Sequence, residues 1–93
     1  IEKVLCISVN DPFVMKAWGK EHKVENKILM VGDYKAEFTK NIGAELDLNK
    51  KGLGIRSSRY TMLVEKGNII KISEEEVAGK CENTAAENFL KEI

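Results

Sequence analysis

The sequence predicts an α/β fold in which a mixed β-sheet lies between two layers of helices, giving three layers in all. The first observation is that short apolar runs alternate with segments of helical periodicity along the chain. The second is a pair of strand-like runs joined by a short turn, which indicates an antiparallel hairpin at the sheet edge. With 93 residues the chain is long enough for one small domain and too short for two.

The first strand and the first helix have the clearest signals. Residues 4–9 are almost all apolar, as expected for a strand buried on both faces of a parallel sheet. Asp11 and Pro12 follow, and an Asp N-cap before a Pro at the first helical position is a strong helix-start signal. An apolar face of the helix is expected from Phe13, Val14, Ala17 and Trp18. Phe13 and Trp18 are therefore interpreted as packing in the core or at a subunit interface.

The middle of the chain repeats this order more weakly. A second apolar strand is predicted at 28–31, and a short helix at 36–42. Gly43 is predicted to end that helix as a C-cap. The stretch 46–55 contains two glycines and is expected to be an irregular connection.

The last third predicts the hairpin and a terminal helix. Strands are expected at 59–64 and 69–72 around a turn at 66–68. The run 74–76, three glutamates, is interpreted as solvated charge. Thr84 and Glu87 have the spacing of a capping box that opens the terminal helix. The residues expected to face inward on that helix are Phe89, Leu90 and Ile93.

Composition argues against several classes of partner. Lys and Arg total 15 and Asp and Glu total 15, and no basic stripe indicates a nucleic acid or an anionic membrane. The apolar runs are far shorter than the roughly 20 residues that cross a bilayer. Cys6 and Cys81 match no metal-ligand spacing, and a single His leaves a zinc site short of ligands. No metal site is predicted, and a reducing compartment is favoured over a disulfide scaffold.

Two longer motifs carry a family resemblance. The first is CISVNDPFVMKAW at 6–18, and the second is LDL at 46–48 followed by KGLGIRSSRY at 51–60. Together they resemble the type II, peroxiredoxin-5-like (atypical two-cysteine) thiol peroxidases, and the similarity runs along the whole chain. The resemblance implies a thioredoxin-like fold and the reduction of hydrogen peroxide and alkyl hydroperoxides. It implies no cofactor.

The resemblance covers only the later part of the family domain. The family places its peroxidatic cysteine in a P-x-x-x-T-x-x-C motif, and neither Cys6 nor Cys81 has Pro and Thr at those offsets. Residues 1–93 are therefore expected to be a partial domain without the N-terminal strands and the catalytic-cysteine helix. The sheet would otherwise lose a central strand and leave apolar strands with unpaired backbone groups. We expect the missing segment in the native particle, on the same chain, a companion chain or a swapped neighbour.

Arginines are the first candidates for chemistry. The resemblance implies that Arg59 lies beside the peroxidatic cysteine. A guanidinium there favours the thiolate, which is the nucleophile, and can hold the peroxide oxygens. The alternative is a strand-start arginine in a surface ion pair. Arg56 is expected either to orient the substrate or to brace its loop, and the bracing interpretation is favoured.

The two cysteines are the other candidates. Cys6 is interpreted as a small core residue, and the resemblance adds the alternative of a resolving cysteine that condenses with a sulfenic acid. Cys81 is a weaker resolving candidate, because it is offset by about two positions from the family's cysteine. If neither residue resolves, glutaredoxin, thioredoxin or glutathione would reduce the sulfenic acid.

Two functional hypotheses follow. The first is the C-terminal portion of a cytoplasmic thiol peroxidase, with an organelle as the alternative location and a homodimer as the assembly implied by resemblance. Its peroxidatic cysteine would lie outside this chain, so the 93 residues alone would be inactive. The second is a non-catalytic thioredoxin-like binding or degenerate module. The absence of the peroxidatic motif from these 93 residues favours the second, and retention of the 56–60 motif favours the first.

Overall fold

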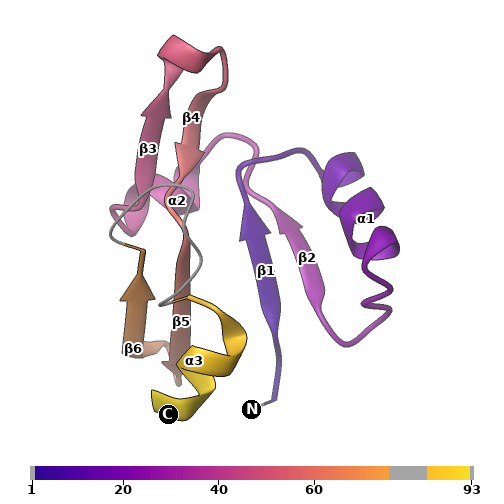
Figure 1. Cartoon of the computed structure of the whole chain (residues 1–93), viewed down its shortest axis with the longest axis vertical. Coiled ribbons are helices and arrows are strands. Elements are labelled where there is room, and N and C mark those ends of the chain that lie inside the picture. The colour runs from indigo at the N-terminus through magenta and orange to yellow at the C-terminus, as the bar shows by residue number, and fades with distance from the viewer. Residues whose placement is uncertain (1, 76–83, 93) are drawn as a thin grey trace. The chain divides into compact units, whose positions relative to one another are not determined.

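The computed structural model describes residues 2–75 and 84–92, and these divide into two compact units, 1–57 and 58–93. The units are described separately below, and Figure 1 labels their elements. The elements follow in the order β1 (Leu5–Ser8), α1 (Pro12–Glu21), β2 (Leu29–Gly32), α2 (Glu37–Asn41), β3 (Glu45–Leu48), η1 (Asn49–Lys51), β4 (Gly54–Ser57), β5 (Tyr60–Glu65), β6 (Asn68–Glu74) and α3 (Ala86–Glu92).

The first unit begins with a β–α–β arrangement. Strands β1 and β2 are parallel, with Cys6 opposite Met30 and Ser8 opposite Gly32. The helix α1 connects them and packs against β2, as parallel strands require a crossover connection. This confirms both predicted strands and their parallel pairing, but not their predicted burial on both faces, because Leu5 is 53% exposed and Leu29 61% exposed.

The start of α1 is confirmed, but its predicted inward face is wrong. Asp11 is the N-cap and accepts a hydrogen bond of 2.8 Å from the backbone N–H of Val14, directly before the proline at the first helical position. The buried residues of α1 are Met15, which is 1% exposed, and Gly19. Phe13 is 82% exposed. An aromatic side chain at position 13 therefore contributes nothing to the core of this unit.

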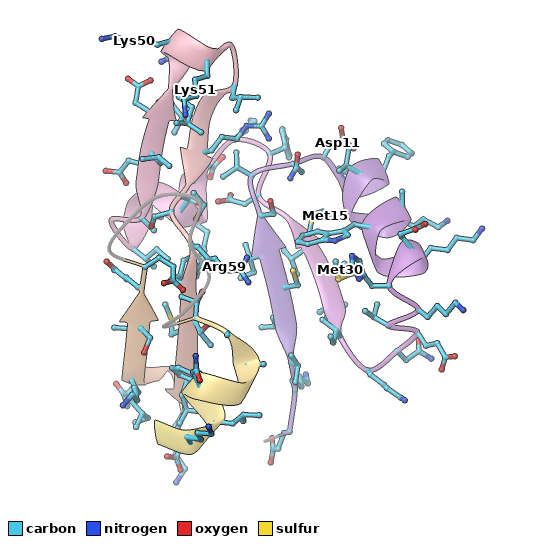
Figure 2. All side chains as sticks on the ribbon, in the orientation of Figure 1. Asp11, Met15, Met30, Lys50, Lys51 and Arg59 are labelled. Carbon is cyan, nitrogen blue, oxygen red and sulfur yellow. The ribbon has the colours of Figure 1, made fainter. Side chains whose placement is uncertain are left out.

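The close approach of Gly19 to β2 sets the rotation of α1. A Cβ on Gly19 would lie 2.8 Å from Cγ of Met30, so this glycine allows the helix and the strand to touch. Met15 and Met30 lie between α1 and β2 in Figure 2. This contact turns Met15 inward and leaves the Phe13 side of the helix, with Trp18, at the surface. The Trp18 ring instead packs edge-on against the ring of His22, at 6.1 Å between centroids.

Asp33 links the end of the parallel pair to α2. Its backbone N–H donates to the carbonyl of Ser8 at 2.8 Å. Its carboxylate accepts hydrogen bonds from the backbone N–H of Thr39 at 2.9 Å, from the Thr39 hydroxyl at 2.6 Å and from the backbone N–H of Phe38 at 3.3 Å. Burial raises the pKa of Asp33, but these hydrogen bonds lower it by more, so the pKa lies below the ordinary value of 3.8. The carboxylate thus caps the first turn of α2 in its charged form.

Strands β3 and β4 correct one prediction. The stretch 46–55, predicted to be irregular, contains most of an antiparallel hairpin whose tip is the short helix η1. Asp47 accepts a hydrogen bond of 2.9 Å from the backbone N–H of Asn49, and Gly52 takes a left-handed φ of 75° to close the turn. The alternation of charged and apolar residues in β3 is a strand signal that the glycines obscured. Lys50 and Lys51 lie at this tip in Figure 2.

The second unit confirms the predicted hairpin. Strands β5 and β6 are antiparallel, with a register shift at Leu63 and Val64 that marks a β-bulge. Lys66 and Gly67 form the turn with φ of 50° and 81°, the two left-handed residues of a type I′ hairpin. Strand β5 is shifted by one residue from its predicted range of 59–64, and β6 extends beyond its predicted range of 69–72 at both ends.

The terminal helix α3 begins at Ala86, one residue later than the capping box predicts. The Thr84 hydroxyl has a different role: it bonds to Arg59 and Glu75. Phe89 is buried as predicted, but Leu90 is 55% exposed. Ile93 lies outside the described residues.

The described residues combine a parallel strand pair with two antiparallel pairs and helices, in agreement with the predicted α/β class. They bury few large apolar side chains: Met15 and Phe89 are the largest of the core, which also contains Val9, Ala36 and Ala44. Over the parts of the chain that the structure describes, no helix combines the length and apolar character needed to span a membrane.

Candidate functional site

Arg59 lies directly before β5, at the open end of the β5–β6 hairpin. Its backbone carbonyl accepts a hydrogen bond of 3.2 Å from the N–H of Glu75, which follows β6 directly. Its exposed side chain donates from Nε to the hydroxyl oxygen of Thr84 at 2.8 Å. Both the main chain and the side chain of Arg59 are therefore held by residues of the same unit.

Thr84 is the centre of this cluster. It is buried, and its backbone N–H and hydroxyl both donate to Oε2 of Glu75, at 2.7 and 2.5 Å. Its carbonyl accepts a hydrogen bond of 2.8 Å from the hydroxyl of Thr61 in β5. Since an ionised carboxylate only accepts hydrogen bonds, the hydroxyl proton of Thr84 points at Glu75 and its lone pairs face Arg59. We call these four residues, Arg59, Thr61, Glu75 and Thr84, the Arg59 cluster.

The chemistry of the Arg59 cluster is that of a fixed cation. The contact with Thr84 uses Nε, and a guanidinium carries four further N–H donors on its two Nη groups. A guanidinium whose orientation is fixed can stabilise a thiolate or a peroxide oxygen that lies beside it. None of the four residues of the cluster carries a thiol.

Arg56 belongs to the first unit and has a different set of partners. From β4 its Nη1 donates to the carbonyl of Val9 at 2.9 Å and to Oδ1 of Asn10 at 3.1 Å, while Nε donates to the carbonyl of Leu53 at 2.8 Å. Asn10 in turn donates from Nδ2 to the hydroxyl of Ser8 at 2.7 Å. Arg56 thus connects the β3–β4 hairpin to the loop that follows β1.

The cysteines contribute less to the described geometry. Cys6 is half-buried in β1, where it pairs in register with Met30. Cys81 lies outside the described residues. In the described portion of the chain, no group of His, Cys, Asp and Glu side chains has an arrangement that could hold a metal ion.

The structure groups the predicted residues into separate sets. Arg59 has its partners in the second unit, and Arg56 and Cys6 lie in the first. Sequence reasoning missed Glu75, which was interpreted as solvated charge, and gave Thr84 a capping role. Neither residue is close to Arg59 in sequence, and only the return of the hairpin brings them together. The one available signal was Thr84 itself, a threonine in a polar loop.

Comparison with known proteins places these motifs in context. Residues 1–90 match the family model described as Redoxin. The whole chain is 42% identical to peroxiredoxin-2D of Arabidopsis thaliana, of which it covers 57%, and 42% identical to the chloroplastic peroxiredoxin-2E of the same plant, of which it covers 40%. The crystal structure of reduced Prx3 in complex with hydrogen peroxide from Vibrio vulnificus matches 99% of the chain with a TM-score of 0.90 and 39% identity, over 56% of that protein.

These matches confirm the predicted fold class, since the structural relative shares both the arrangement and over a third of the residues. The fold is the α/β arrangement of the thioredoxin-like peroxiredoxins. The chain spans about half the length of the relatives that it matches.

Proposed function

The chain belongs to the redoxin family, and on that premise we propose that it is the C-terminal portion of a thiol-dependent peroxidase. The complete enzyme would reduce hydrogen peroxide and alkyl hydroperoxides, with its peroxidatic cysteine outside these 93 residues. The observation that carries the proposal is the guanidinium of Arg59, whose Nε is bonded to Thr84 and whose two Nη groups carry the N–H donors that would bind substrate. The peroxiredoxin relatives support the reaction class.

The proposed reaction has two thiol steps. A thiolate sulfur attacks one peroxide oxygen, an S–O bond forms and the O–O bond breaks. The leaving oxygen takes a proton and departs as water or an alcohol, and the cysteine becomes a sulfenic acid. A second thiol then condenses with the sulfenic acid to give a disulfide and water, and an external thiol reductant restores the first thiol.

Arg59 would act in the first step. A positive charge beside the peroxidatic thiol lowers its pKa and increases the thiolate fraction at neutral pH. The same group would stabilise the negative charge that develops on the leaving oxygen. Arg56, with its guanidinium bonded to Val9, Asn10 and Leu53, is assigned the bracing role and not substrate orientation.

The resolving step has three candidates. Cys6 is half-buried, so resolution by this thiol requires local opening of β1. Cys81 is the second candidate in this chain. An external thiol, from glutaredoxin, thioredoxin or glutathione, is the third, and a cytoplasmic location would supply all of them. The relative named as chloroplastic makes an organelle the alternative location.

We also propose that the missing segment pairs with strands of this chain in the native particle. In the described residues the strands form three separate two-stranded sheets, and such a pair is only marginally stable alone. Leu5 in β1 and Leu29 in β2 are 53% and 61% exposed. A further strand would cover such side chains and satisfy the strand edge. A homodimer would in addition cover Phe13.

The competing function is a non-catalytic thioredoxin-like binding or degenerate module. The observation in its favour is that neither cysteine of these 93 residues lies in the peroxidatic motif. The test is a coupled peroxidase assay of the complete polypeptide, with the Arg59→Ala variant and the isolated 93 residues for comparison. We expect activity in the complete protein, a loss of about a hundredfold in Arg59→Ala, and none in the isolated chain. An inactive complete protein with an intact thiol would support the binding module.

A further inference from the structure

Two side chains, Thr84 and Glu75, form a chain of hydrogen bonds that ends at the guanidinium of Arg59. Thr84 has one hydroxyl proton, and its hydroxyl donates that proton in a hydrogen bond to Oε2 of Glu75, with 2.5 Å between the two oxygens. The Thr84 oxygen can then only accept from its other neighbour, which is Nε–H of Arg59 at 2.8 Å. The direction of each bond is therefore fixed, from the guanidinium through the hydroxyl to the carboxylate.

We propose that Glu75 and Thr84 are positioning residues for Arg59, in which the carboxylate orients the guanidinium through the hydroxyl between them. The inference rests on the proposed function, because that function gives the guanidinium its reaction. It goes further in naming which side chains set the direction of the Nη donors.

We call the chain of hydrogen bonds from Arg59 through Thr84 to Glu75 the relay, and its central residue is held by further hydrogen bonds. Thr84 is buried, its N–H is bonded to Glu75 at 2.7 Å and its carbonyl accepts from Thr61 at 2.8 Å. The backbone of Glu75 is bonded to the carbonyl of Arg59 at 3.2 Å, so both ends of the relay start from the same end of the hairpin. A flexible, exposed arginine is thereby limited to a narrow range of orientations.

The relay also keeps the carboxylate of Glu75 separated from the positively charged guanidinium that the proposed reaction requires. The Thr84 hydroxyl lies between Nε of Arg59 and Oε2 of Glu75 and bonds to both. The carboxylate can therefore orient the guanidinium through an intervening neutral group, which leaves the Nη groups to act on the reacting atoms of the proposed reaction. Donors fixed before the reaction stabilise developing charge without reorganisation during it.

Three variants of the complete protein test the relay. Thr84→Val removes the hydroxyl at nearly constant shape, Thr84→Ser retains it, and Glu75→Gln can donate an amide N–H to the Thr84 oxygen in competition with Arg59. Glu65→Gln makes the same chemical change at an exposed carboxylate of β5 and serves as the matched control. The readouts are the rate constant for oxidation by hydrogen peroxide across pH and the hydrogen exchange of the Arg59 Nε–H followed by NMR.

We expect Thr84→Val to lower the rate constant about tenfold, the effect of one lost hydrogen bond to a charged group. It should raise the pH at which the peroxidatic thiol ionises and accelerate exchange at Arg59 Nε. Thr84→Ser should restore all three readouts, Glu75→Gln should lie between the two, and Glu65→Gln should match the unmodified protein.

A double-variant comparison separates positioning from general damage. Adding Thr84→Val to Arg59→Ala should lower the rate no further, because the hydroxyl acts through the guanidinium. A further loss in that background would overturn the relay. The relay also fails, and the proposed function stands, if Arg59→Ala slows the reaction and Thr84→Val does not. If Arg59→Ala itself has no effect, both ideas are wrong.

Discussion

Thr39 donates both its backbone N–H and its hydroxyl to a single carboxylate oxygen of Asp33, at 2.9 and 2.6 Å. The backbone N–H of Asp33 is bonded at the same time to the carbonyl of Ser8, at the end of β1. One residue therefore joins the parallel strand pair to the first turn of α2. Two tests of stability follow from this contact.

The first test is the dependence of stability on pH. The pKa of Asp33 is lower in the folded chain than its ordinary value of 3.8, because the hydrogen bonds outweigh the effect of burial. Its contribution to stability is therefore complete above pH 3.8 and is lost as the pH falls through the folded pKa. Urea unfolding followed by circular dichroism between pH 2 and pH 6 measures this loss.

The Asp33→Asn variant should remove that acid-dependent component and cost about 1 kcal/mol at neutral pH, as loss of a charged helix cap does. Glu21→Gln, a neutralised carboxylate at the exposed end of α1, is the control and should retain the acid dependence. Equal pH profiles for Asp33→Asn and the unmodified chain would contradict the assignment.

The second prediction concerns two glycines of the first unit. A Cβ on Gly32 would lie 2.7 Å from the backbone carbonyl oxygen of Asn10, which cannot move without displacing the loop. A Cβ on Gly19 would lie 2.8 Å from Cγ of Met30, a flexible side chain. We expect Gly32→Ala to cost about 3 kcal/mol and Gly19→Ala less, since the gain in helix propensity offsets part of its overpacking. Equal midpoints in chemical unfolding would contradict this order.

Much of this fold was predictable because local signals agreed with the tertiary contacts. Asp11 and Pro12 fixed the start of α1, and Gly67 fixed the turn of the second hairpin. The inward face of α1 was not predictable, because it depends on the approach of Gly19 to Met30, and these residues are distant in sequence. Hydrophobicity alone favoured burial of Phe13. The close contact between the backbone of Gly19 and the side chain of Met30 instead turns Phe13 to the surface.

The third prediction separates the two interpretations of Arg56. Its three hydrogen bonds go to Leu53, Val9 and Asn10. Arg56→Ala should therefore lower the free energy of unfolding by about 2 kcal/mol, and in the complete protein leave KM for peroxide unchanged. Arg56→Lys should not restore stability, because an ammonium cannot reproduce the fork of donors. A raised KM with unchanged stability would favour substrate orientation.

The fourth prediction concerns the exposed aromatic face of α1. Because Phe13 is 82% exposed, Phe13→Asp should change the stability of this chain by less than about 0.5 kcal/mol. In the complete protein it should weaken self-association, measured by sedimentation velocity over a range of concentrations. Tyr34→Asp, at another exposed aromatic of the same unit, is the matched control. Identical association of both variants and the unmodified protein would exclude a dimer contact at Phe13.

The candidate site could be proposed only where a long motif pointed to it. The 51–60 motif singled out Arg59 and Arg56 as candidates, but it does not predict which residues hold their side chains. Glu75 is one of three consecutive glutamates, and its position next to Thr84 depends on the register of β5 and β6. A contact between residues that are distant in the sequence leaves no local sequence pattern, so the relay could not be predicted from the sequence.

The most direct test of the central claim is intact-mass spectrometry of the native polypeptide after one equivalent of hydrogen peroxide and a sulfenic-acid trap such as dimedone. The account predicts a polypeptide, or an accompanying fragment, beyond the 10.5 kDa of these residues. It should carry one trapped adduct, and peptide mapping should place that adduct on a cysteine other than Cys6 and Cys81. A single 10.5 kDa species with no adduct would contradict the peroxidase and leave the binding module.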